Sequence, residues 1–408
     1  MAQCRFCNSE SMKVFLSLGK TPLANSYLTE ETLGRAEPFY PLDLFLCEDC
    51  LLVQLPEFEK AENIFSVYAY FSSYSSSWLE HAQIYAGSMI RRFGLGKKSL
   101  VVELGSNDGY LLQFFKQENI PVLGVEPAGN VAEIAQEKGI ETQVAFFGSA
   151  FAEELVNEGK RPDLIVGNNI LAHVPDLNHF VAGMKKLLGG KGVITMEFPH
   201  LLRLIGKNQF DTIYHEHFSY FSLLTVVKVF ESQGLKIFDV DEIPTHGGSL
   251  RIYAKHREDH SKRISDSITG LIAREIEAGL DNIDTYFSFG ERVKEIKAGI
   301  LDFLFTARRD QKTVVGYGAP AKGNTLLNYC GIKPDLMDYT VDLNPYKQNK
   351  FLPGSRIPIF SPDKIRATRP DFVFILPWNL KEEIMEQIGY VREWGCKFVV
   401  PIPKIQVM

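Results

Sequence analysis

Four of the six cysteines lie near the start of the chain and form two pairs, Cys4–Cys7 and Cys47–Cys50. Two thiols separated by two residues can bind the same tetrahedral ion, and four thiolates leave a zinc ion no open position for catalysis. The gap between the pairs, residues 8–46, is longer than the roughly 15–20 residues of common zinc ribbons, but an inserted loop costs little entropy. We therefore predict a structural zinc site. The alternatives are a disulfide pair and four unrelated buried thiols.

Residues 211–220 form a segment dense in groups that can donate or accept a proton. The segment follows an expected strand end at residues 197–200, so we expect it on the carboxyl side of a sheet, where α/β proteins bind ligands. A histidine has a pKa near ambient pH and can remove a proton from carbon, and a tyrosine hydroxyl can steady the resulting enolate. The candidates of these types are Tyr214, His217 and, at another strand end, His173.

Two other interpretations of this segment remain open. His215 and His217 could ligate a second metal ion, although alternation along a strand would place them on opposite faces. The segment could also cap a helix and form a solvated face.

A glycine-bearing loop, residues 103–109, joins an expected strand to an expected helix and has the pattern Glu-x-Gly-x-x-x-Gly. Gly105 allows a tight turn and a close approach of a ligand to the backbone. Glu126 ends the next strand, where a carboxylate can accept hydrogen bonds from both hydroxyls of a ribose. An acid at the start of the loop suits a cationic or zwitterionic ligand better than a pyrophosphate. S-adenosylmethionine has an ammonium group and a ribose, and Asn168 and Asn169 end a third strand. A generic strand–turn–helix is the alternative.

A second glycine-bearing loop spans residues 315–324 and again follows an expected strand. The backbone amides of the loop, the N-terminus of the next helix and the ammonium group of Lys322 together suit a phosphate. Pro320 and the absence of Gly-x-Gly-x-x-Gly argue against ordinary NAD binding, and a structural tight turn is the alternative. Residues near later strand ends extend this face and could hold a sugar nucleotide: Asp342, Asn344, Lys347 and Trp378.

The order of apolar and polar stretches predicts the elements that hold these groups. Strands alternate with helical stretches after residue 99, and a second series of the same kind begins at residue 313. Such alternation indicates parallel βαβ units in doubly wound sheets. Residues 262–310 are polar, helix-favouring and free of proline, so we expect a helical connector there. Strands are expected at residues 42–46, 100–104, 122–125, 164–166, 192–196, 313–318, 339–341, 372–376 and 397–400, and helices at 76–93 and 109–117.

The composition fits a globular protein. The chain has 408 residues, of which 45% are hydrophobic and 23% charged, and a net charge of −6. This charge gives no electrostatic reason to expect nucleic acid or an anionic membrane as a partner. No apolar run approaches the roughly 20 residues that span a bilayer, and the first residues lack a signal-peptide pattern. We therefore expect a cytoplasmic protein with reduced thiols, and a monomer is compatible with the sequence.

Taken together, these motifs resemble the sugar C3-methyltransferases of unusual deoxysugar biosynthesis, which act on nucleotide-linked 4-keto-6-deoxysugars. The resemblance extends over essentially the whole chain and includes the Tyr-rich residues 70–74 and the segment His-Gly-Gly-Ser-Leu-Arg at residues 246–251. It implies an α/β fold with a small zinc-binding domain at residues 1–65 and a Rossmann-like S-adenosylmethionine domain at 66–261. At 262–408 it implies the connector and a Rossmann-like α/β domain that helps to bind the nucleotide-sugar.

The resemblance also implies a reaction. The 4-keto group acidifies the proton at C3, His217 removes this proton, and the enolate carbon attacks the sulfonium methyl group without a metal. The implied companions of His217 are Tyr214, Glu216 and His173. The implied cofactor contacts are Tyr68, Tyr70, Ser73, Glu103, Gly105, Asn107, Gly109, Glu126, Pro127, Asn168 and Asn169. The implied substrate contacts are Arg251, Tyr317, Gly318, Ala321, Lys322, Asn324, Asp342, Asn344, Lys347 and Trp378.

Two other functions compete with this prediction. The C-terminal loop could serve an NAD-dependent nucleotide-sugar oxidoreductase or epimerase, which a copurified nicotinamide would reveal. The second is a zinc-knuckle binding module with decayed enzyme domains, but the dense His and Tyr segment argues against such decay.

Overall fold

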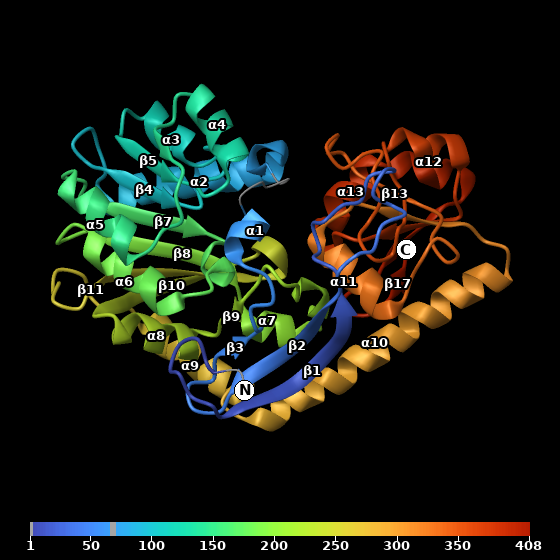
Figure 1. Ribbon diagram of the computed structural model, residues 1–408, viewed down its shortest axis with the longest axis horizontal. Helices are drawn as coiled ribbons and strands as arrows, with labels where there is room; N and C mark the ends of the chain where they lie inside the picture. The colour runs from blue at the N-terminus through green and yellow to red at the C-terminus, as the bar shows by residue number, and fades with distance from the viewer. Residues whose placement is uncertain (1–2, 66–70) are drawn as a thin grey trace.

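The computed structural model describes residues 3–65 and 71–408. In Figure 1 the described chain forms two neighbouring bodies, one built on a central sheet and the other on a C-terminal sheet. Strands β1 (Met12–Thr21) and β2 (Tyr40–Cys47) run between the two bodies beside the long helix α10 (Ile283–Arg309). The N-terminal strands and α10 therefore hold the two bodies together.

The central sheet has the strand order β10-β11-β8-β7-β4-β5-β6 among the described residues. Strands β4 to β8 pair in parallel, whereas β10 and β11 add an antiparallel edge. Neighbouring residues Val101 and Val102 of β4 belong to two different apolar clusters, because alternate side chains of a strand point to opposite faces and helices cover both. The strands are β4 (Val101–Leu104), β5 (Val122–Val125), β6 (Thr142–Gln143), β7 (Leu164–Asn168), β8 (Val193–Pro199), β10 (Leu235–Ile243) and β11 (Ser249–His256). The helices are α2 (Ser76–Phe93), α3 (Leu112–Gln117), α4 (Gly129–Glu137), α5 (Ser149–Asn157), α6 (Leu177–Leu187), α7 (Leu201–Gly206) and α8 (Leu223–Ser232).

The C-terminal sheet has the strand order β14-β13-β12-β15-β16-β17 among the described residues, and its last strand is antiparallel. Helix α11 starts shortly after β12, so its N-terminus and the amides of the preceding loop lie at the carboxyl edge of the sheet. The strands are β12 (Val314–Tyr317), β13 (Thr340–Val341), β14 (Ile359–Phe360), β15 (Phe372–Ile375), β16 (Lys397–Val400) and β17 (Gln406–Val407). The helices are α11 (Ala321–Cys330), α12 (Asp363–Thr368) and α13 (Lys381–Gln387).

The N-terminal sheet has the order β1-β2-β3-β9, and β9 comes from the central part of the chain. Strand β3 (Val53–Gln54) pairs antiparallel with β9 (Ser219–Tyr220). Next to this pair, Leu55 N donates a hydrogen bond to Phe218 O at 3.0 Å. The N-terminal sheet, whose strand β2 ends at Cys47, is therefore fixed to the segment that carries His217.

Helix α10 packs along the N-terminal hairpin and the C-terminal body. A buried residue recurs every three or four positions along the helix, which gives it one continuous apolar face. Phe15 of β1 packs edge-on against Tyr286 of α10, with 5.2 Å between ring centroids. The shorter helix α9 (Asp266–Glu277) precedes it. The buried face of α10 contains Tyr286, Phe289, Val293, Ile296, Ile300, Leu304 and Ala307.

The predicted fold class is confirmed, with an N-terminal cysteine-bearing sheet followed by two α/β sheets of parallel strands. The helix predicted at residues 76–93 is α2, with the same bounds. The helix predicted from residue 109 begins only at Leu112, because Gly109 has a φ of +75° and cannot continue a right-handed helix. Short 3-10 turns occur at η1 (Ser72–Tyr74), η2 (Leu171–His173), η3 (Phe210–Thr212), η4 (Thr245–Gly247), η5 (Trp378–Leu380) and η6 (Gly389–Trp394).

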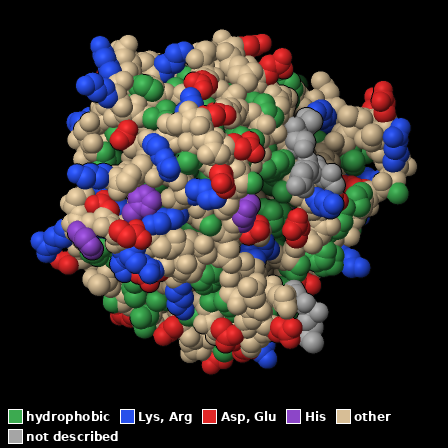
Figure 2. Space-filling view, turned by 60° about the vertical axis from the view of Figure 1, so that its left-hand side comes forward, with side chains coloured by type: hydrophobic (Ala, Val, Ile, Leu, Met, Phe, Trp, Pro, Cys, Tyr) green, Lys and Arg blue, Asp and Glu red, His purple; other side chains and the backbone are tan. Residues whose placement is uncertain are grey.

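The surface carries charges of both signs. On the face shown in Figure 2, Lys and Arg side chains are interspersed with Asp and Glu. Among the described residues, no helix is both long and apolar enough to cross a membrane.

Candidate active site and cysteine cluster

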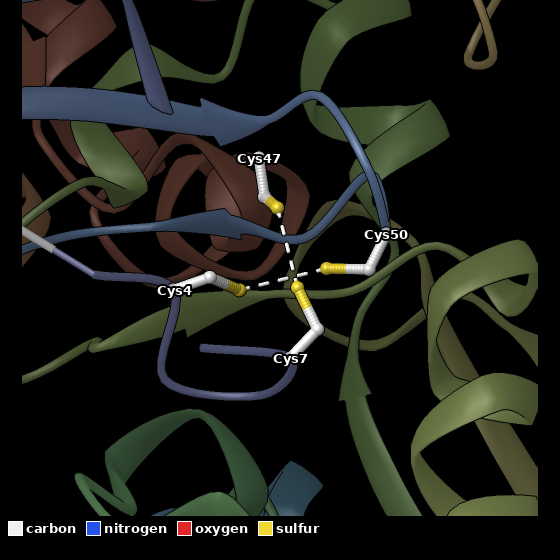
Figure 3. Close-up of side chains that lie close together, drawn as sticks. All are labelled: Cys4, Cys7, Cys47 and Cys50. Atoms are coloured by element: carbon white, nitrogen blue, oxygen red, sulfur yellow. Dashed lines mark hydrogen bonds between the residues drawn. The ribbon is translucent and has the colours of Figure 1, made fainter. Parts of the chain in front are cut away.

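The four paired cysteines converge on one point (Figure 3). Their sulfur atoms all lie within 4.8 Å of one another. Cys4 Sγ lies 3.5 Å from Cys50 Sγ, and Cys7 Sγ lies 3.5 Å from Cys47 Sγ. Such a closed group of four thiols fits a tetrahedral structural zinc ion and leaves no position for water or substrate.

Both Cys-x-x-Cys turns have the same backbone hydrogen bond. Asn8 N donates to Cys4 O, and Leu51 N donates to Cys47 O, each at 2.9 Å. Asn8 has a φ of 61° and Leu51 a φ of 69°, so the backbone turns sharply directly after the second cysteine of each pair. The hydrogen bond from the Cys50 thiol lowers the pKa of Cys4 to about 4, which favours the thiolate form that zinc binds.

A cavity of about 420 Å³ lies at the carboxyl ends of β4, β5 and β7 and extends to the C-terminal body. Helix α1 (Ala61–Phe65), which lies between the two bodies in Figure 1, contributes to its wall. The predicted site residues that line the cavity are Gly105, Asn107, Glu126, Pro127, Asn168, Asn169, His173, Tyr214, His217, Ala321, Lys322 and Lys347. Tyr68 and Tyr70, predicted as cofactor contacts, lie outside the described residues.

Glu126 and Asn168 mark one half of the cavity. Glu126 Oε2 accepts a hydrogen bond from Asn107 N and Oε1 accepts one from Ala128 N, both at 2.9 Å, and each oxygen keeps a further lone pair. Neither Oδ1 nor Nδ2 of Asn168 is hydrogen-bonded to any residue that the structure describes, although both atoms are buried. Buried polar groups are rarely left unpaired, so this half fits a ligand with vicinal hydroxyls and polar ends, as S-adenosylmethionine has.

Three other predicted cofactor contacts lie behind this half instead of lining it: Ser73, Glu103 and Gly109. Glu103 lies within β4 and is fully buried. Burial, and then repulsion from Glu126, raise the pKa of Glu103 well above its ordinary value, while the Tyr110 hydroxyl opposes the rise. Ser73 Oγ donates to the Asp108 carboxylate. The structure therefore does not bring these side chains to the cavity.

Tyr214 and His217 form a hydrogen-bonded pair in the other half. The Tyr214 hydroxyl lies 2.7 Å from His217 Nε2, and His217 Nδ1 lies 3.1 Å from Thr212 O. Because a carbonyl only accepts, Nδ1 carries the proton and Nε2 accepts the tyrosine hydroxyl. Burial, and then the neighbouring His173, lower the pKa of His217 well below 6.5, so the ring is a neutral base. The two histidine rings meet edge-on at 4.7 Å between centroids.

Glu216 and His215 are not among the residues that line the cavity. Glu216 Oε1 accepts a hydrogen bond from Asn25 Nδ2 at 2.7 Å, so this carboxylate fixes the N-terminal loop. His215 Nε2 donates to Pro41 O at 3.0 Å. Within residues 3–65 and 71–408, the group of side chains placed to hold a metal ion is the cysteine cluster, so the structure offers no support for a second metal site at His215 and His217.

Lys322 supplies a cation on the C-terminal side of the cavity. Its Nζ donates to Asn379 Oδ1 at 2.6 Å and lies 4.6 Å from the centre of the Trp378 ring. Burial lowers the pKa of Lys322, and the Asp211 carboxylate opposes this. Lys347 Nζ donates to Ala319 O at 2.9 Å, which places a second cation beside the start of α11.

Seven predicted substrate contacts support the cavity wall without lining it: Arg251, Tyr317, Gly318, Asn324, Asp342, Asn344 and Trp378. Gly318 belongs to the backbone turn before α11, and each of the other six makes at least one hydrogen bond within the protein, although Asn324 Oδ1 is buried without a partner among the described residues. The contacts are Arg251 Nε to Glu197 Oε1 (2.6 Å), Tyr317 Oη to Gln387 Oε1 (2.7 Å), Asn324 Nδ2 to Ala24 O (2.6 Å), Ala319 N to Asp342 Oδ2 (2.7 Å), Tyr346 N to Asn344 Oδ1 (2.9 Å) and Trp378 Nε1 to Asp211 Oδ2 (2.6 Å).

Arg5 connects the cysteine cluster to this cavity. Its Nη1 donates to Pro175 O at 2.8 Å, and its Nη2 donates to Leu55 O. The guanidinium lies over the Phe218 ring at 5.3 Å from the centroid. The loop between the first two cysteines thus contacts chain segments next to His173 and His217.

Several residues that line the cavity were not predicted as site residues. These are Asn25, Tyr27, Ser72, Trp78, Tyr110, Phe146, Phe147, Thr212 and His246. His246 belongs to a motif noted in the sequence, and Phe146 and Phe147 follow β6. Asn25 and Tyr27 carried no signal, because their loop reaches the cavity through a bridge between Leu28 and Phe351.

Comparisons with known proteins cover the same three regions. Family models match as a zinc binding domain over residues 4–65, a methyltransferase domain over 78–240, and a C-methyltransferase C-terminal domain over 244–403. The C-methyltransferase NovU of Streptomyces niveus is 37% identical over 407 residues, which are 100% of this chain and 96% of that protein. A ubiquinone biosynthesis O-methyltransferase of Bartonella quintana (strain Toulouse) is 26% identical over 23% of this chain and 38% of its own length. A crystal structure of magnesium protoporphyrin IX methyltransferase from Synechocystis PCC 6803 overlaps 43% of this chain and 82% of its own, with 14% identity and a TM-score of 0.35.

Proposed function

Since the chain belongs to the S-adenosylmethionine-dependent sugar C-methyltransferase family, we propose that it methylates C3 of a nucleotide-linked 4-keto-6-deoxysugar through an enolate. The observation that carries this proposal is the neutral Tyr214–His217 pair, which lines the same cavity as Glu126 and Asn168. A candidate base and a candidate binding surface for the methyl donor therefore line one cavity, as transfer to carbon requires.

Glu126 and its neighbours would hold the methyl donor. Bound S-adenosylmethionine supplies an electrophilic methyl group. We assign the remaining lone pairs of Glu126 to the ribose hydroxyls and the unpaired amide of Asn168 to the amino-acid end. Gly105 has a φ of +68°, and this left-handed turn brings backbone close to the same space.

Tyr214 and His217 would remove the proton from C3. Because the Tyr214 hydroxyl donates to His217 Nε2, the C3 proton passes to the tyrosine oxygen while the hydroxyl proton passes to Nε2. The carbonyl of Thr212 accepts from Nδ1–H and stabilises the imidazolium that forms. The lowered pKa of His217 keeps the ring free of a proton at neutral pH.

Lys322 and Lys347 would hold the phosphates of the nucleotide-sugar. Both line the cavity next to the N-terminus of α11, where backbone amides and the helix dipole favour an anion. Lys322, in the first turn of α11, lines the cavity, and its Nζ donates a hydrogen bond to Asn379 Oδ1. This arrangement orients the sugar from the C-terminal body toward the base in the central one.

Methyl transfer with a carbon-13-labelled donor tests the proposal. The protein is incubated with S-adenosylmethionine labelled in its methyl group and a panel of nucleotide-linked 4-keto-6-deoxysugars that differ in base and C3 substituent. NMR should place the label on C3 of at least one of these sugars. A label on oxygen or on another carbon would contradict the proposal, and turnover that consumes NAD in place of the labelled donor would favour a nucleotide-sugar oxidoreductase.

A further inference from the structure

His246 lies in the cavity and has no part in the steps above. It belongs to the turn η4 between β10 and β11, and its backbone has a φ of 54°. Left-handed backbone is uncommon for a residue other than glycine and persists where the surrounding structure enforces it.

The two glycines after His246 let the turn pack closely against its neighbours. A Cβ on Gly247 would lie 2.6 Å from Gln209 Nε2 and 2.6 Å from Trp378 Cη2. A Cβ on Gly248, which has a φ of 123°, would lie 2.7 Å from Arg203 Cγ. Gln209 Nε2 also donates to Gly247 O at 2.9 Å. These contacts fix the position of the turn.

The histidine ring is held on two sides. Trp78 packs against it at 5.1 Å between ring centroids. Asn169 Nδ2 lies 3.1 Å from His246 Nε2, and because this amide nitrogen can only donate, Nε2 is the acceptor. The proton of the neutral ring is therefore on Nδ1. Burial, and then the charge of Lys322, lower the pKa of His246 to about 4, so the ring stays neutral at neutral pH.

The Nδ1–H group makes no hydrogen bond to any residue of the described ranges 3–65 and 71–408, and the ring lines the cavity. His217 lines the same cavity. The cavity thus holds both a base and an N–H donor whose ring is fixed by Asn169 and Trp78. Such a donor is what a carbonyl oxygen needs when negative charge develops on it.

We propose that His246 Nδ1–H donates a hydrogen bond to the 4-keto oxygen of the sugar and stabilises the enolate oxygen. As the C3–H bond breaks, its electron pair forms the C3–C4 double bond and the carbonyl π pair moves to the oxygen. The proton goes to the Tyr214–His217 pair, and His246 keeps its own proton. This inference rests on the proposed function, because it assigns the acceptor in that enolate route.

Exchange of the C3 proton with deuterium oxide tests this inference. It is followed by NMR with S-adenosylhomocysteine bound, so that no methyl group is transferred. The variants are His246→Gly, which tolerates the left-handed backbone but removes the donor, and His246→Asn, which tolerates it and restores an N–H group. The exposed His260, which follows β11 in the chain, provides the matched control, His260→Ala. Melting temperatures establish that each variant is folded.

We expect His246→Gly to slow exchange by about 10²–10³-fold, His246→Asn to recover part of the loss, and His260→Ala to match the unmodified chain. Dissociation constants of S-adenosylhomocysteine and of the nucleotide-sugar should stay unchanged in all three variants. Normal exchange in His246→Gly would overturn the inference, as would a loss confined to cofactor affinity. Absence of exchange in the unmodified chain would instead overturn the enolate route, and the role of His246 with it.

Discussion

Replacement of Tyr214 by phenylalanine separates a proton relay from a merely positioning hydroxyl. The substitution removes one oxygen and leaves the ring, which lies 4.0 Å from the His217 ring between centroids. If the hydroxyl only orients His217, the loss is one neutral hydrogen bond of about 0.5–1.5 kcal/mol, or about 2- to 13-fold in rate. If the hydroxyl carries the proton from C3 to Nε2, the loss is that of a general base, about 10²–10⁴-fold.

The Tyr214 hydroxyl lies 2.7 Å from His217 Nε2 and already donates its proton to the lone pair of this nitrogen. The C3 proton must then reach His217 through the tyrosine oxygen, so the geometry favours the larger effect. We expect Tyr214→Phe to lower kcat by at least about 10²-fold with KM for the nucleotide-sugar nearly unchanged. Steady-state methyl transfer measures both constants, and Tyr390→Phe, at a half-buried tyrosine that does not line the cavity, is the control. A fall in kcat of less than about tenfold would refute the relay.

Three further outcomes follow from the geometry. One zinc ion should be bound per chain. Chelation of this ion should lower both the melting temperature and kcat, because strand β3 of the N-terminal sheet pairs with β9 beside His217. A zinc-free chain with full activity would contradict this expectation. Glu126→Gln should weaken S-adenosylhomocysteine binding by about 10- to 100-fold in calorimetry. Glu133→Gln, on the exposed face of α4, should leave this affinity unchanged. If Glu126→Gln and the unmodified chain bind S-adenosylhomocysteine equally well, the ribose lies elsewhere. Burial, and then the neighbouring His173, lower the pKa of His217 below 6.5. C3 exchange should therefore stay constant as the pH falls from neutral to 6.5, and a loss of exchange centred above pH 6.5 would show that another group is the base.

Local patterns in the sequence predicted the parts of the site that a short stretch of chain can build. The cysteine spacing indicated the cluster, and the strand-end positions of Glu126 and Asn168 indicated the half of the cavity that fits S-adenosylmethionine. Regular elements such as α2 could be predicted because caps and apolar periodicity are local. The Ser75 side chain, for instance, accepts a hydrogen bond from Trp78 N at the start of α2.

Contacts between distant segments could not be predicted in this way. In the motif at residues 246–251, the sequence drew attention to the charged Arg251, which instead lies in β11 and pairs with the buried Glu197. His246, at the turn of the same hairpin, reaches the cavity only because the hairpin packs against Gln209 and Trp378. Which member of a motif faces the ligand therefore depended on the topology of the whole sheet.

Release of deuterium from the C3 position tests the central claim most directly. The substrate is a nucleotide-linked 4-keto-6-deoxysugar deuterated at C3, and the label that appears in water is measured with S-adenosylhomocysteine bound. We predict release by the unmodified chain and a loss of about 10²–10⁴-fold in His217→Asn, with cofactor and sugar affinities retained. Release at the normal rate by His217→Asn, or methyl transfer by the unmodified chain that leaves the deuterium on C3, would contradict base-generated enolate formation at this site.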